Sequence, residues 1–314
     1  MFAPQKPKID FLAREPHHAL HARAVYDALP ERRRGIFTSN PAELSSGIVA
    51  VFSYGDLKQV SQLGKKAVFG EHGVGMYYNT EHPSYAGSGE DRDCVVLRLS
   101  PNENHAAKER ATLDCPVEVV GVPKMDKWAN ARPKMPMRAR RATIAISFHW
   151  DCLVCPETRS SFLHYKSALL ALRSKYRVIG HGHPRIIERM RSIYKAYGIV
   201  IEEDFEEVMR KADVYICDNS STIFEFAFQG KPVVLLNCPS YRKDVEHPGN
   251  PRFWKHAGIG PQVDRPEDLV GTVDRLLQSY REYLPKMAEA TREIFTFTDG
   301  RCAERAAAAI TKHL

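Results

Sequence analysis

The sequence predicts an α/β protein of two domains, each built on a parallel sheet with helices on both faces. Short apolar segments typical of buried strands alternate with segments whose apolar residues recur at helical spacing. This alternation stops at a basic, proline-containing stretch and then starts again. We therefore expect two Rossmann-like domains, at residues 1–122 and 143–314, which are joined by a linker at 123–142 and face a central cleft.

The expected elements follow this alternation in chain order. Before the linker the strands are 8–13, 47–52, 67–69, 94–99 and 117–120, and the helices are 18–29, 56–63 and 105–113. After it the strands are 142–148, 176–179, 199–201, 214–217 and 232–236, and the helices are 162–174, 184–197, 206–211, 222–228, 266–280 and 301–313. The last helix is assigned to the second domain, but its packing on the first domain stays open.

Composition indicates an ordinary globular protein, because the 314 residues are 43% hydrophobic and 26% charged. The longest apolar runs, such as Gly47–Phe52, are far shorter than the roughly 18 residues that a membrane span needs. The polar start has no secretory pattern, so we expect a cytoplasmic protein. The seven cysteines do not indicate a disulfide framework. Cys152 and Cys155 are interpreted as plain thiols, with metal and redox roles as alternatives.

Most of the net charge of +7 comes from one segment. Residues 124–141 hold seven cations and one anion, a net charge of +6. We interpret this segment, Lys124 to Arg141, as a solvated interdomain linker. The alternative is that it contacts an anionic acceptor, a nucleic acid or a membrane, which would make the protein peripheral at the membrane surface.

The best candidate site follows the expected strand 214–217. The segment from Asp218 to Thr222 lies between the end of that strand and the start of a helix, where open α/β sheets bind ligands. Unpaired N–H groups at a helix start, together with the hydroxyls of Ser220 and Ser221, suit a phosphate. Glu225 is placed one turn further, where it can accept hydrogen bonds from a ribose diol. The alternative is that one of the serines is an ordinary N-cap.

A second candidate site is the turn Gly70-Glu71-His72-Gly73-Val74-Gly75, which follows an expected strand. An imidazole with an ordinary pKa of about 6.5 can accept a proton at neutral pH. The glycines let the backbone approach a ligand closely. The alternative is a loop histidine that only hydrogen-bonds the backbone.

Other histidines also follow expected strands. His181 and His183 come before Pro184, which is suited to begin a helix, and they could stabilise the charge of a diphosphate. Zinc ligation is an alternative that no nearby acidic pattern supports, so we expect no metal. Three earlier histidines could line the cleft or cap the first helix, namely His17, His18 and His21.

Six short motifs, in order from position 71 to 305, resemble those of the CDP-glycerol glycerophosphotransferase family, the enzymes of teichoic-acid polymer synthesis. They are Glu71-His72-Gly73, Gly121-Val122-Pro123-Lys124-Met125-Asp126, Phe148-His149-Trp150-Asp151, His183-Pro184, Asp218-Asn219-Ser220-Ser221 with Phe224-Glu225-Phe226-Ala227 and Gly230-Lys231-Pro232, and Asp299-Gly300-Arg301-Cys302-Ala303-Glu304-Arg305.

The resemblance implies a GT-B fold with the nucleotide-diphosphate donor on the second domain, the hydroxyl acceptor on the first, and no required metal or other cofactor. It implies that His72 is the acceptor base and that His183 supports the departing nucleotide. The site residues expected from motif and resemblance together are His72 and His183 for catalysis, His181, Asp218, Ser220, Ser221, Thr222 and Glu225 for the donor, and His17, His18, Glu71 and Gly73 for the acceptor.

Two departures from the family pattern leave the transferred group open. Glu71 replaces the family's tryptophan, and Asp151 replaces an arginine, so one cation expected near the cleft is missing. CDP-glycerol and a nucleotide sugar therefore remain alternative donors. A non-hydrolysing nucleotide-sugar epimerase is another alternative, although it would need several acidic groups in the first domain. A non-catalytic module for polyanions or nucleic acid is the third.

Overall fold

The computed structural model describes residues 6–75, 92–130, 142–151, 159–239, 242 and 254–314, and the chain divides into two compact units. Unit 1 comprises Met1–Val74, Asn79–Ala131 and Arg292–Leu314, and unit 2 comprises Gly75–Tyr78 and Arg132–Thr291. The last helix thus lies with unit 1, as do residues 123–130, which the sequence analysis placed in the linker. The remainder of that linker and both cysteines of the C-x-x-C motif lie outside the described residues.

Unit 1 is built on a parallel sheet of six strands, in the order β2-β1-β3-β4-β5-β6 within the described residues. The strands are β1 Ile9–Leu12, β2 Arg34–Thr38, β3 Ile48–Val51, β4 Lys66–Gly70, β5 Val95–Ser100 and β6 Val117–Val119. Because β1 lies between β2 and β3, the strand order reverses at β1. Such a reversal opens a crevice at the carboxyl ends of β1 and β3, the usual ligand position in open α/β sheets.

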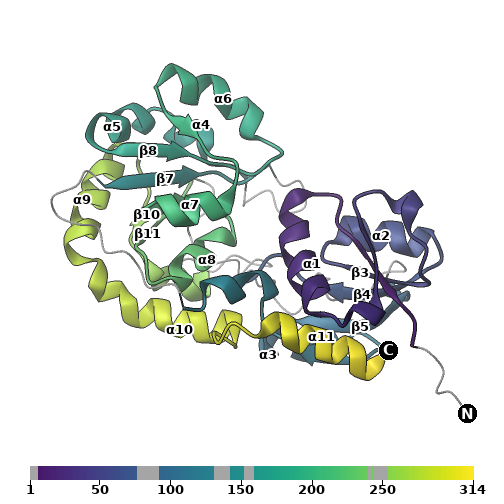
Figure 1. The fold of residues 1–314 in the computed structure, drawn as a ribbon. Coiled ribbons are helices and arrows are strands. Elements are labelled where there is room, and N and C mark those ends of the chain that lie inside the picture. The colour runs from purple at the N-terminus through teal and green to yellow at the C-terminus, as the bar shows by residue number, and fades with distance from the viewer. Residues whose placement is uncertain (1–5, 76–91, 131–141, 152–158, 240–241, 243–253) are drawn as a thin grey trace, which may run out of the picture. The chain divides into compact units, whose positions relative to one another are not determined.

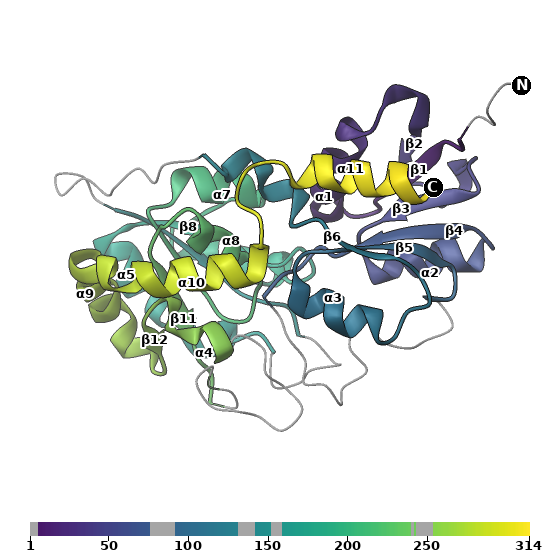
Figure 2. The ribbon, with the colours of Figure 1, turned by 90° about the horizontal axis from the view of Figure 1, so that it is seen from below.

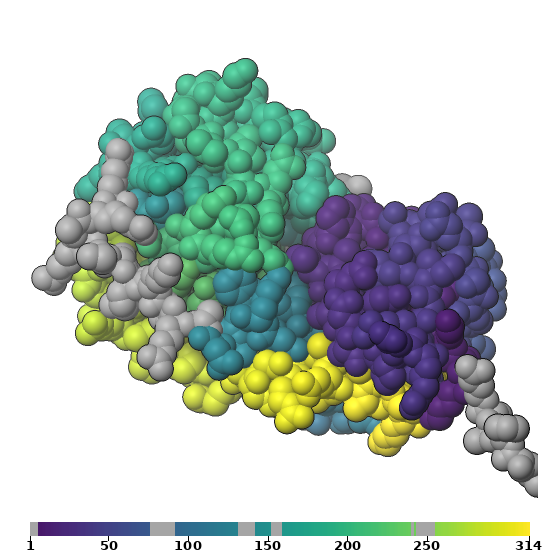
Figure 3. Space-filling view, in the orientation of Figure 1, coloured from purple at the N-terminus to yellow at the C-terminus, as the bar shows by residue number. Residues whose placement is uncertain are grey.

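Helices cover both faces of this sheet (Figure 2). The helices of unit 1 are α1 Pro16–Ala28, α2 Tyr54–Gln62, α3 Glu103–Arg110 and α11 Cys302–His313. Apolar side chains of α1 and α11 share one core with Phe11, Ala50 and Leu97. Leu57 and Val60 of α2 belong to the core on the opposite face. Helix α11 therefore packs beside α1, and Figure 3 shows its yellow residues against the purple N-terminal part of the unit.

Unit 2 is built on a second parallel sheet, in the order β12-β11-β10-β7-β8-β9. The strands are β7 Thr143–Ser147, β8 Arg177–Gly180, β9 Val200–Ile201, β10 Val214–Cys217, β11 Val233–Leu236 and β12 Gln262–Val263. Numbered from β7, this is the strand order of a classical Rossmann fold, whose reversal point lies between the first and fourth strands. The carboxyl ends of β7 and β10 flank that point.

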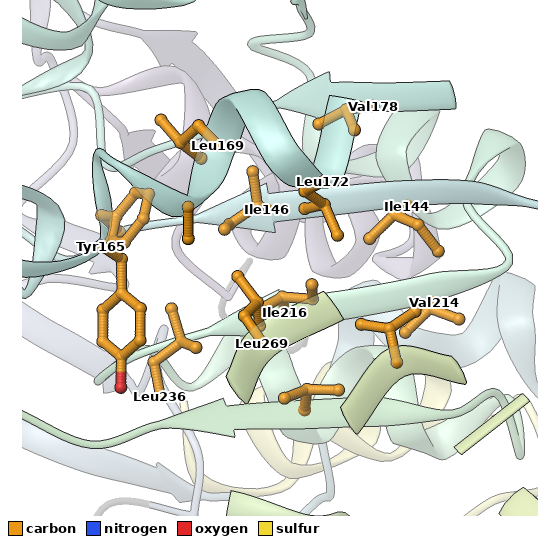
Figure 4. Close-up of a cluster of buried hydrophobic side chains, with 14 of the residues drawn as sticks. Ile144, Ile146, Tyr165, Leu169, Leu172, Val178, Val214, Ile216, Leu236 and Leu269 are labelled. Carbon is orange, nitrogen blue, oxygen red and sulfur yellow. The ribbon is translucent and has the colours of Figure 1, made fainter. Parts of the chain in front are cut away.

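The helices of unit 2 also lie on both faces of its sheet (Figure 1). They are α4 Phe162–Tyr165, α5 Ala168–Lys175, α6 Ile187–Ala196, α7 Phe205–Lys211, α8 Thr222–Phe228, α9 Leu269–Ser279 and α10 Leu284–Phe295, and the unit boundary falls inside α10. Figure 4 shows Leu169, Leu172 and Leu269 packed on Ile144 and Ile216 of the strands. On the other face, aromatic residues of α7 and α8 contact the ring of Tyr215.

Short 3₁₀ turns complete the described elements: η1 Glu31–Arg33, η2 Pro41–Glu43, η4 Pro123–Trp128, η6 Trp254–Ile259, η7 Pro266–Asp268 and η8 Tyr280–Tyr283. Within the described residues, no helix has the length and apolar character needed to cross a membrane.

Among the described strands and α-helices, three were not predicted, namely β2, β12 and α10. β2 is an edge strand whose residues are mostly only partly buried, so it lacks the apolar run that marked the other strands. β12 has only two residues. The predicted helix 162–174 is divided into α4 and α5, and α6 begins at Ile187 rather than at Pro184.

The buried carboxylate of Asp10 holds the edge of the first sheet. It accepts hydrogen bonds from the backbone N–H groups of Ile36, Ser45 and Ser46 at 2.7–2.8 Å. Gly35 makes room for it, because a Cβ there would lie 2.1 Å from Asp10 Oδ1. Burial alone would raise the pKa of Asp10, but these hydrogen bonds outweigh it and lower the pKa.

Two of the family-like motifs pack against each other within unit 1. Asp126 accepts hydrogen bonds from the backbone N–H groups of Cys302 at 2.9 Å and Ala303 at 2.7 Å. It therefore caps the start of α11 from a distant part of the chain. Gly121 has a φ of +83°, and a Cβ there would lie 2.5 Å from the Cys302 sulfur. Asp126 and Gly121 of one motif thus allow the start of α11, which carries the other motif, to pack against unit 1.

We predict that Asp126→Ala destabilises the protein by about 1–2 kcal/mol, the typical cost of losing a helix cap. Asp126→Asn should cost less, because its amide oxygen can still accept one of the two hydrogen bonds. Urea unfolding of the full chain measures both. Equal stability of the alanine variant and the wild type would show that α11 does not depend on this cap.

The lowered pKa of Asp10 should make the free energy of unfolding of the protein depend on pH. Its folded-state pKa is lowered, so its contribution is complete above the unfolded value of about 3.9 and is lost as the pH falls through the folded value. Asp10→Asn should lose about 1–3 kcal/mol at neutral pH, because backbone donors are left unpaired. The difference in unfolding free energy between wild type and variant should be constant well above about pH 3.9 and should narrow as the pH falls below that value. A difference that stays constant below that value would contradict the assignment.

Candidate functional site

In unit 1, polar side chains gather where β1, β3 and β4 end. His17 and His18 stand in the first turn of α1, which follows β1. Asp56 stands in the first turn of α2, which follows β3. His72 follows β4 directly. Since the strands are parallel and neighbouring, their carboxyl ends place these side chains at one edge of the sheet.

The His72 ring is held in one orientation. Its Nδ1 lies 2.8 Å from the backbone oxygen of Phe52, and because a carbonyl can only accept, Nδ1 carries the hydrogen. In the neutral ring this leaves the Nε2 lone pair available for another proton. Burial, followed by the nearby His18, His17 and Lys124, holds the pKa of His72 well below its usual value. The ring is thus neutral at physiological pH.

His17 and His18 lie beside His72. The ring centroid of His18 is 4.5 Å from that of His72 and 4.0 Å from that of His17. Asp56 faces this group, with its Oδ2 3.5 Å from His18 Nδ1 and its Oδ1 accepting from Arg14 Nε at 2.7 Å. Burial would raise the pKa of Asp56, but hydrogen bonds from the His18, Arg14 and Ser53 side chains outweigh it and lower the pKa.

The sequence analysis missed two members of this cluster and left a third without a site role. Asp56 and Arg14 are single polar residues in expected helix or loop segments, and no spacing pattern linked them to His72. Lys124 was assigned to the linker, yet it lies close enough to lower the pKa of His72. His21 lies fully buried beneath the cluster, with its ring stacked on Phe52 at 6.0 Å. Burial lowers its pKa well below the usual value.

Glu71 is engaged by the protein itself. Its carboxylate lies 2.9 Å from the guanidinium of Arg98, which is fully buried and also pairs with Glu109 at 2.5 Å. Burial raises the pKa of Glu71, and the positive charge of Arg98 offsets this only in part. The predicted acceptor role of Glu71 therefore competes with a structural one, in which the ion pair anchors the turn that carries His72. Gly73 is buried in the same turn.

In unit 2, the Asp218 carboxylate organises the reversal point of the sheet. It accepts hydrogen bonds from the backbone N–H of His149 at 2.7 Å, from both N–H and hydroxyl of Ser161, and from the N–H of Asn219. These bonds join the loops that follow β7 and β10. Asp218 was predicted to contact the donor, but its oxygens are occupied by protein donors and the residue is 1% exposed. Its described contacts are structural.

The serines after β10 differ in their bonding. The Ser220 hydroxyl accepts from the backbone N–H of Thr222 at 3.3 Å and from its hydroxyl at 2.7 Å. Thr222 also shares a 2.7 Å hydrogen bond with the Tyr215 hydroxyl. Ser221 makes no side-chain cap of α8. The capping alternative thus describes Ser220. Both serines are partly exposed, and Ser221, whose hydroxyl does not cap α8, is the better placed of the two to meet a ligand.

His183 lies near the same reversal point. Its ring centroid is 6.0 Å from that of His149 and 5.9 Å from that of Trp150. Its Nδ1 accepts the backbone N–H of Arg185 at 3.2 Å, so the neutral ring carries its hydrogen on Nε2 and can donate from there. Arg185 stacks over the Trp150 ring at 4.5 Å. Sequence reasoning quoted His149 and Trp150 only as motif residues and gave them no role.

Two predicted donor residues are buried. His181 is 7% exposed, and its Nδ1 donates to the backbone oxygen of Glu202 at 2.7 Å. Burial lowers its pKa, although the Glu202 oxygen acts in the opposite direction. Glu225 is 1% exposed, inside α8. A ribose could reach Glu225 only if neighbouring side chains moved. The burial of Glu225 therefore does not support the predicted contact with the ribose.

The comparison with known families finds one match. The family model of CDP-Glycerol:Poly(glycerophosphate) glycerophosphotransferase matches residues 158–312. This range includes the predicted donor residues His181, His183 and Asp218 to Glu225. A comparison with curated protein sequences finds no match.

Several solved structures are similar to this chain. The wall teichoic acid polymerase TagF has a TM-score of 0.68 at 14% identity, over 97% of this chain and 88% of its own. A putative UDP-N-acetylglucosamine 2-epimerase from Listeria monocytogenes has a TM-score of 0.58 at 16% identity, over 98% and 96% of the two chains. The S. aureus MnaA–UDP co-structure has a TM-score of 0.57 at 14% identity, over 95% and 94%. At such low identities these likenesses concern the fold.

The fold and the family expectation are both confirmed. Two parallel sheets with helices on both faces, together with the likeness to TagF and the epimerases, show the GT-B type of α/β fold. The family match covers the second half of the chain, and the six ordered motifs extend to Glu71-His72-Gly73 in the first. The resemblance to the CDP-glycerol glycerophosphotransferase family is thereby confirmed, and the chain is a transferase of the glycosyl- or glycerophosphate-transferring kind.

Proposed function

We propose that this transferase moves a glycerophosphate or a sugar from a nucleotide-diphosphate donor, CDP-glycerol or a nucleotide sugar, to an acceptor hydroxyl, with His72 as the base and no metal required. The observation that carries the proposal is the hydrogen bond from His72 Nδ1 to the Phe52 oxygen. It fixes the tautomer that leaves Nε2 open, and it does so in a glycine-flanked turn at the carboxyl edge of a parallel sheet.

The bond changes follow from this assignment. The acceptor oxygen attacks the phosphorus of the glycerophosphate group, or the anomeric carbon of a sugar, while its proton passes to His72 Nε2. The bond to the nucleotide breaks, and the leaving group takes the electron pair, as CMP from CDP-glycerol or as a nucleoside diphosphate from a nucleotide sugar. The departing anion needs compensating positive charge or hydrogen-bond donors.

Those donors are proposed to come from unit 2. His183 can donate from Nε2, because its Nδ1 is occupied by the Arg185 N–H. Ser221 offers a hydroxyl at the carboxyl end of β10, at the sheet's reversal point. A soak of TagF with CDPG has been described structurally, and that solved structure has a TM-score of 0.67 to this chain. We therefore place the diphosphate at His183, Ser220 and Ser221, while Asp218 positions the surrounding loops.

The bonding of the acidic residues in unit 1 counts against an epimerase. The Glu71 carboxylate pairs with Arg98, and the Asp56 carboxylate pairs with Arg14. Neither is an uncommitted acid or base, although that alternative would need several such groups. The polyanion-binding alternative depends on the basic segment from Lys124 to Arg141, of which residues 131–141 lie outside the described part of the chain, so it stays a prediction from charge alone.

His72→Ala should lower kcat by about 10²–10⁴, the usual contribution of a positioned base, while donor affinity stays near the wild-type value. His164→Ala is the control, because His164 is in unit 2 and its ring contacts the backbone oxygen of Asp264. Turnover should persist in EDTA. Near-normal turnover by the His72→Ala protein, with a donor and acceptor established for the wild type, would refute the base assignment.

Ser221→Ala should weaken donor binding by roughly 1–3 kcal/mol, the cost of losing a hydrogen bond to a charged group. Isothermal calorimetry against CDP-glycerol, UDP-sugars and GDP-sugars both identifies the donor and measures this loss. Ser279→Ala is the matched control, because the Ser279 hydroxyl donates within its own helix to Arg275. If Ser221→Ala binds the identified donor as tightly as Ser279→Ala does, the diphosphate lies elsewhere.

A further inference from the structure

Three imidazoles from two distant chain segments meet at the carboxyl edge of the unit 1 sheet. One ligand atom each of His17, His18 and His72 lies within 4.8 Å of the other two. His18 is buried, and His17 and His72 are partly exposed. The sequence predicts no metal, because no acidic pattern accompanies His181 and His183. The structure places the start of α1 beside the turn after β4.

The orientation of two of these rings is that of metal ligands. Histidines that bind metals usually present one ring nitrogen to a carbonyl or carboxylate and coordinate through the other. His72 Nδ1 donates to the Phe52 oxygen at 2.8 Å, and His18 Nδ1 faces the Asp56 Oδ2 at 3.5 Å. Both therefore direct Nε2 away from these partners. Asp56 is in turn held by Arg14 at 2.7 Å.

The spacing allows coordination after small side-chain rotations. Two nitrogens that bind one tetrahedral Zn²⁺ at about 2.0–2.1 Å lie about 3.4 Å apart. Because the three ligand atoms lie within 4.8 Å of one another, no separation needs to shorten by more than about 1.4 Å. His17 lies in the first turn of α1 and is partly exposed, so the site is accessible to solvent on that side.

We propose that His17, His18 and His72 together bind one divalent transition-metal ion, such as Zn²⁺, and that the bound ion inhibits the enzyme. Imidazole suits Zn²⁺, Ni²⁺ and Cu²⁺, whereas Mg²⁺ and Ca²⁺ prefer oxygen ligands. The Asp56 carboxylate favours a cation here and Lys124 opposes one, so only an ion that forms strong bonds to nitrogen will occupy the site.

Inhibition follows from the geometry and rests on the proposed function of His72. A lone pair on Nε2 that is bound to a metal cannot accept the acceptor's proton. The uninhibited enzyme is therefore the metal-free form, which is consistent with turnover that needs no metal.

The binding test needs no activity. Metal-free full-length protein is titrated with Co²⁺, and the visible ligand-field bands are recorded, followed by displacement with Zn²⁺ in a calorimeter. We expect one ion per chain, with loss of the bands in His17→Ala and His72→Ala. Asp56→Asn should lower the affinity by about 10–100-fold, as loss of an outer hydrogen-bond partner does. Circular dichroism and thermal unfolding establish that each variant is folded.

Two control variants keep the test decisive. His164→Ala should bind Co²⁺ like the wild type. A Cys152→Ser/Cys155→Ser variant should do so too, because the C-x-x-C motif is another metal candidate in the sequence. Absence of saturable binding to the wild type, or binding that survives His17→Ala and His72→Ala, would overturn the proposal. So would binding that disappears with the two cysteines.

An inhibition experiment distinguishes a failure of the metal-site proposal from a failure of the proposed function. Zn²⁺ should inhibit wild-type turnover and EDTA should restore it, whereas His17→Ala should need at least tenfold more Zn²⁺ for half inhibition of its own metal-free rate. Spectroscopic binding without inhibition would leave the metal site standing and overturn the claim that it blocks His72. No turnover in EDTA would instead refute metal-independent catalysis.

Discussion

The hydrogen bond between the His72 ring and the Phe52 carbonyl is the interaction on which the chemistry of unit 1 depends. It joins the ends of β3 and β4, two neighbouring parallel strands, and so fixes a side chain by the geometry of the sheet. The Arg98–Glu71 pair holds the same turn from beneath. Because both partners of that pair are largely buried, removing only one of them would leave a buried charge without its counterion. The turn that carries His72 is therefore held from two sides.

Aspartates that accept backbone N–H groups provide a second common feature of the structure; two of them are buried, and Asp126 is partly buried. Asp10, Asp126 and Asp218 each accept backbone N–H groups from segments distant in the sequence. Asp10 secures an edge strand, Asp126 the last helix and Asp218 the loops at the reversal point of the second sheet. A carboxylate with several backbone donors tolerates burial, because the donors replace the hydration that the charge loses. Motif residues that resemble ligand contacts in the sequence can thus serve to hold loops in place.

Sequence patterns single out a residue where its immediate surroundings suggest a function, and the roles assigned in this way stay predictions. His72 stands in a glycine-flanked turn, and Ser221 stands after a buried strand, so both could be found from spacing. Asp56, Arg14 and Lys124 have no such surroundings, and only the parallel arrangement of β1, β3 and β4 brings Asp56 and Arg14 to the histidines. Conversely, Glu225 and His181 fit a ligand pattern in the sequence but are nearly enclosed by their own unit.

Local patterns in the sequence were enough to predict the alternation of strands and helices, its restart after a basic segment and hence two parallel sheets. Strands that are buried on both faces need apolar runs, and such runs can be recognised locally. The sequence also carried the ordered motifs of the family. The tertiary structure decided that α11 packs beside α1, that Asp126 caps it, and that three histidines from α1 and the turn after β4 share one space. These depend on strand order and on contacts between residues far apart in the chain, for which a local pattern carries no signal.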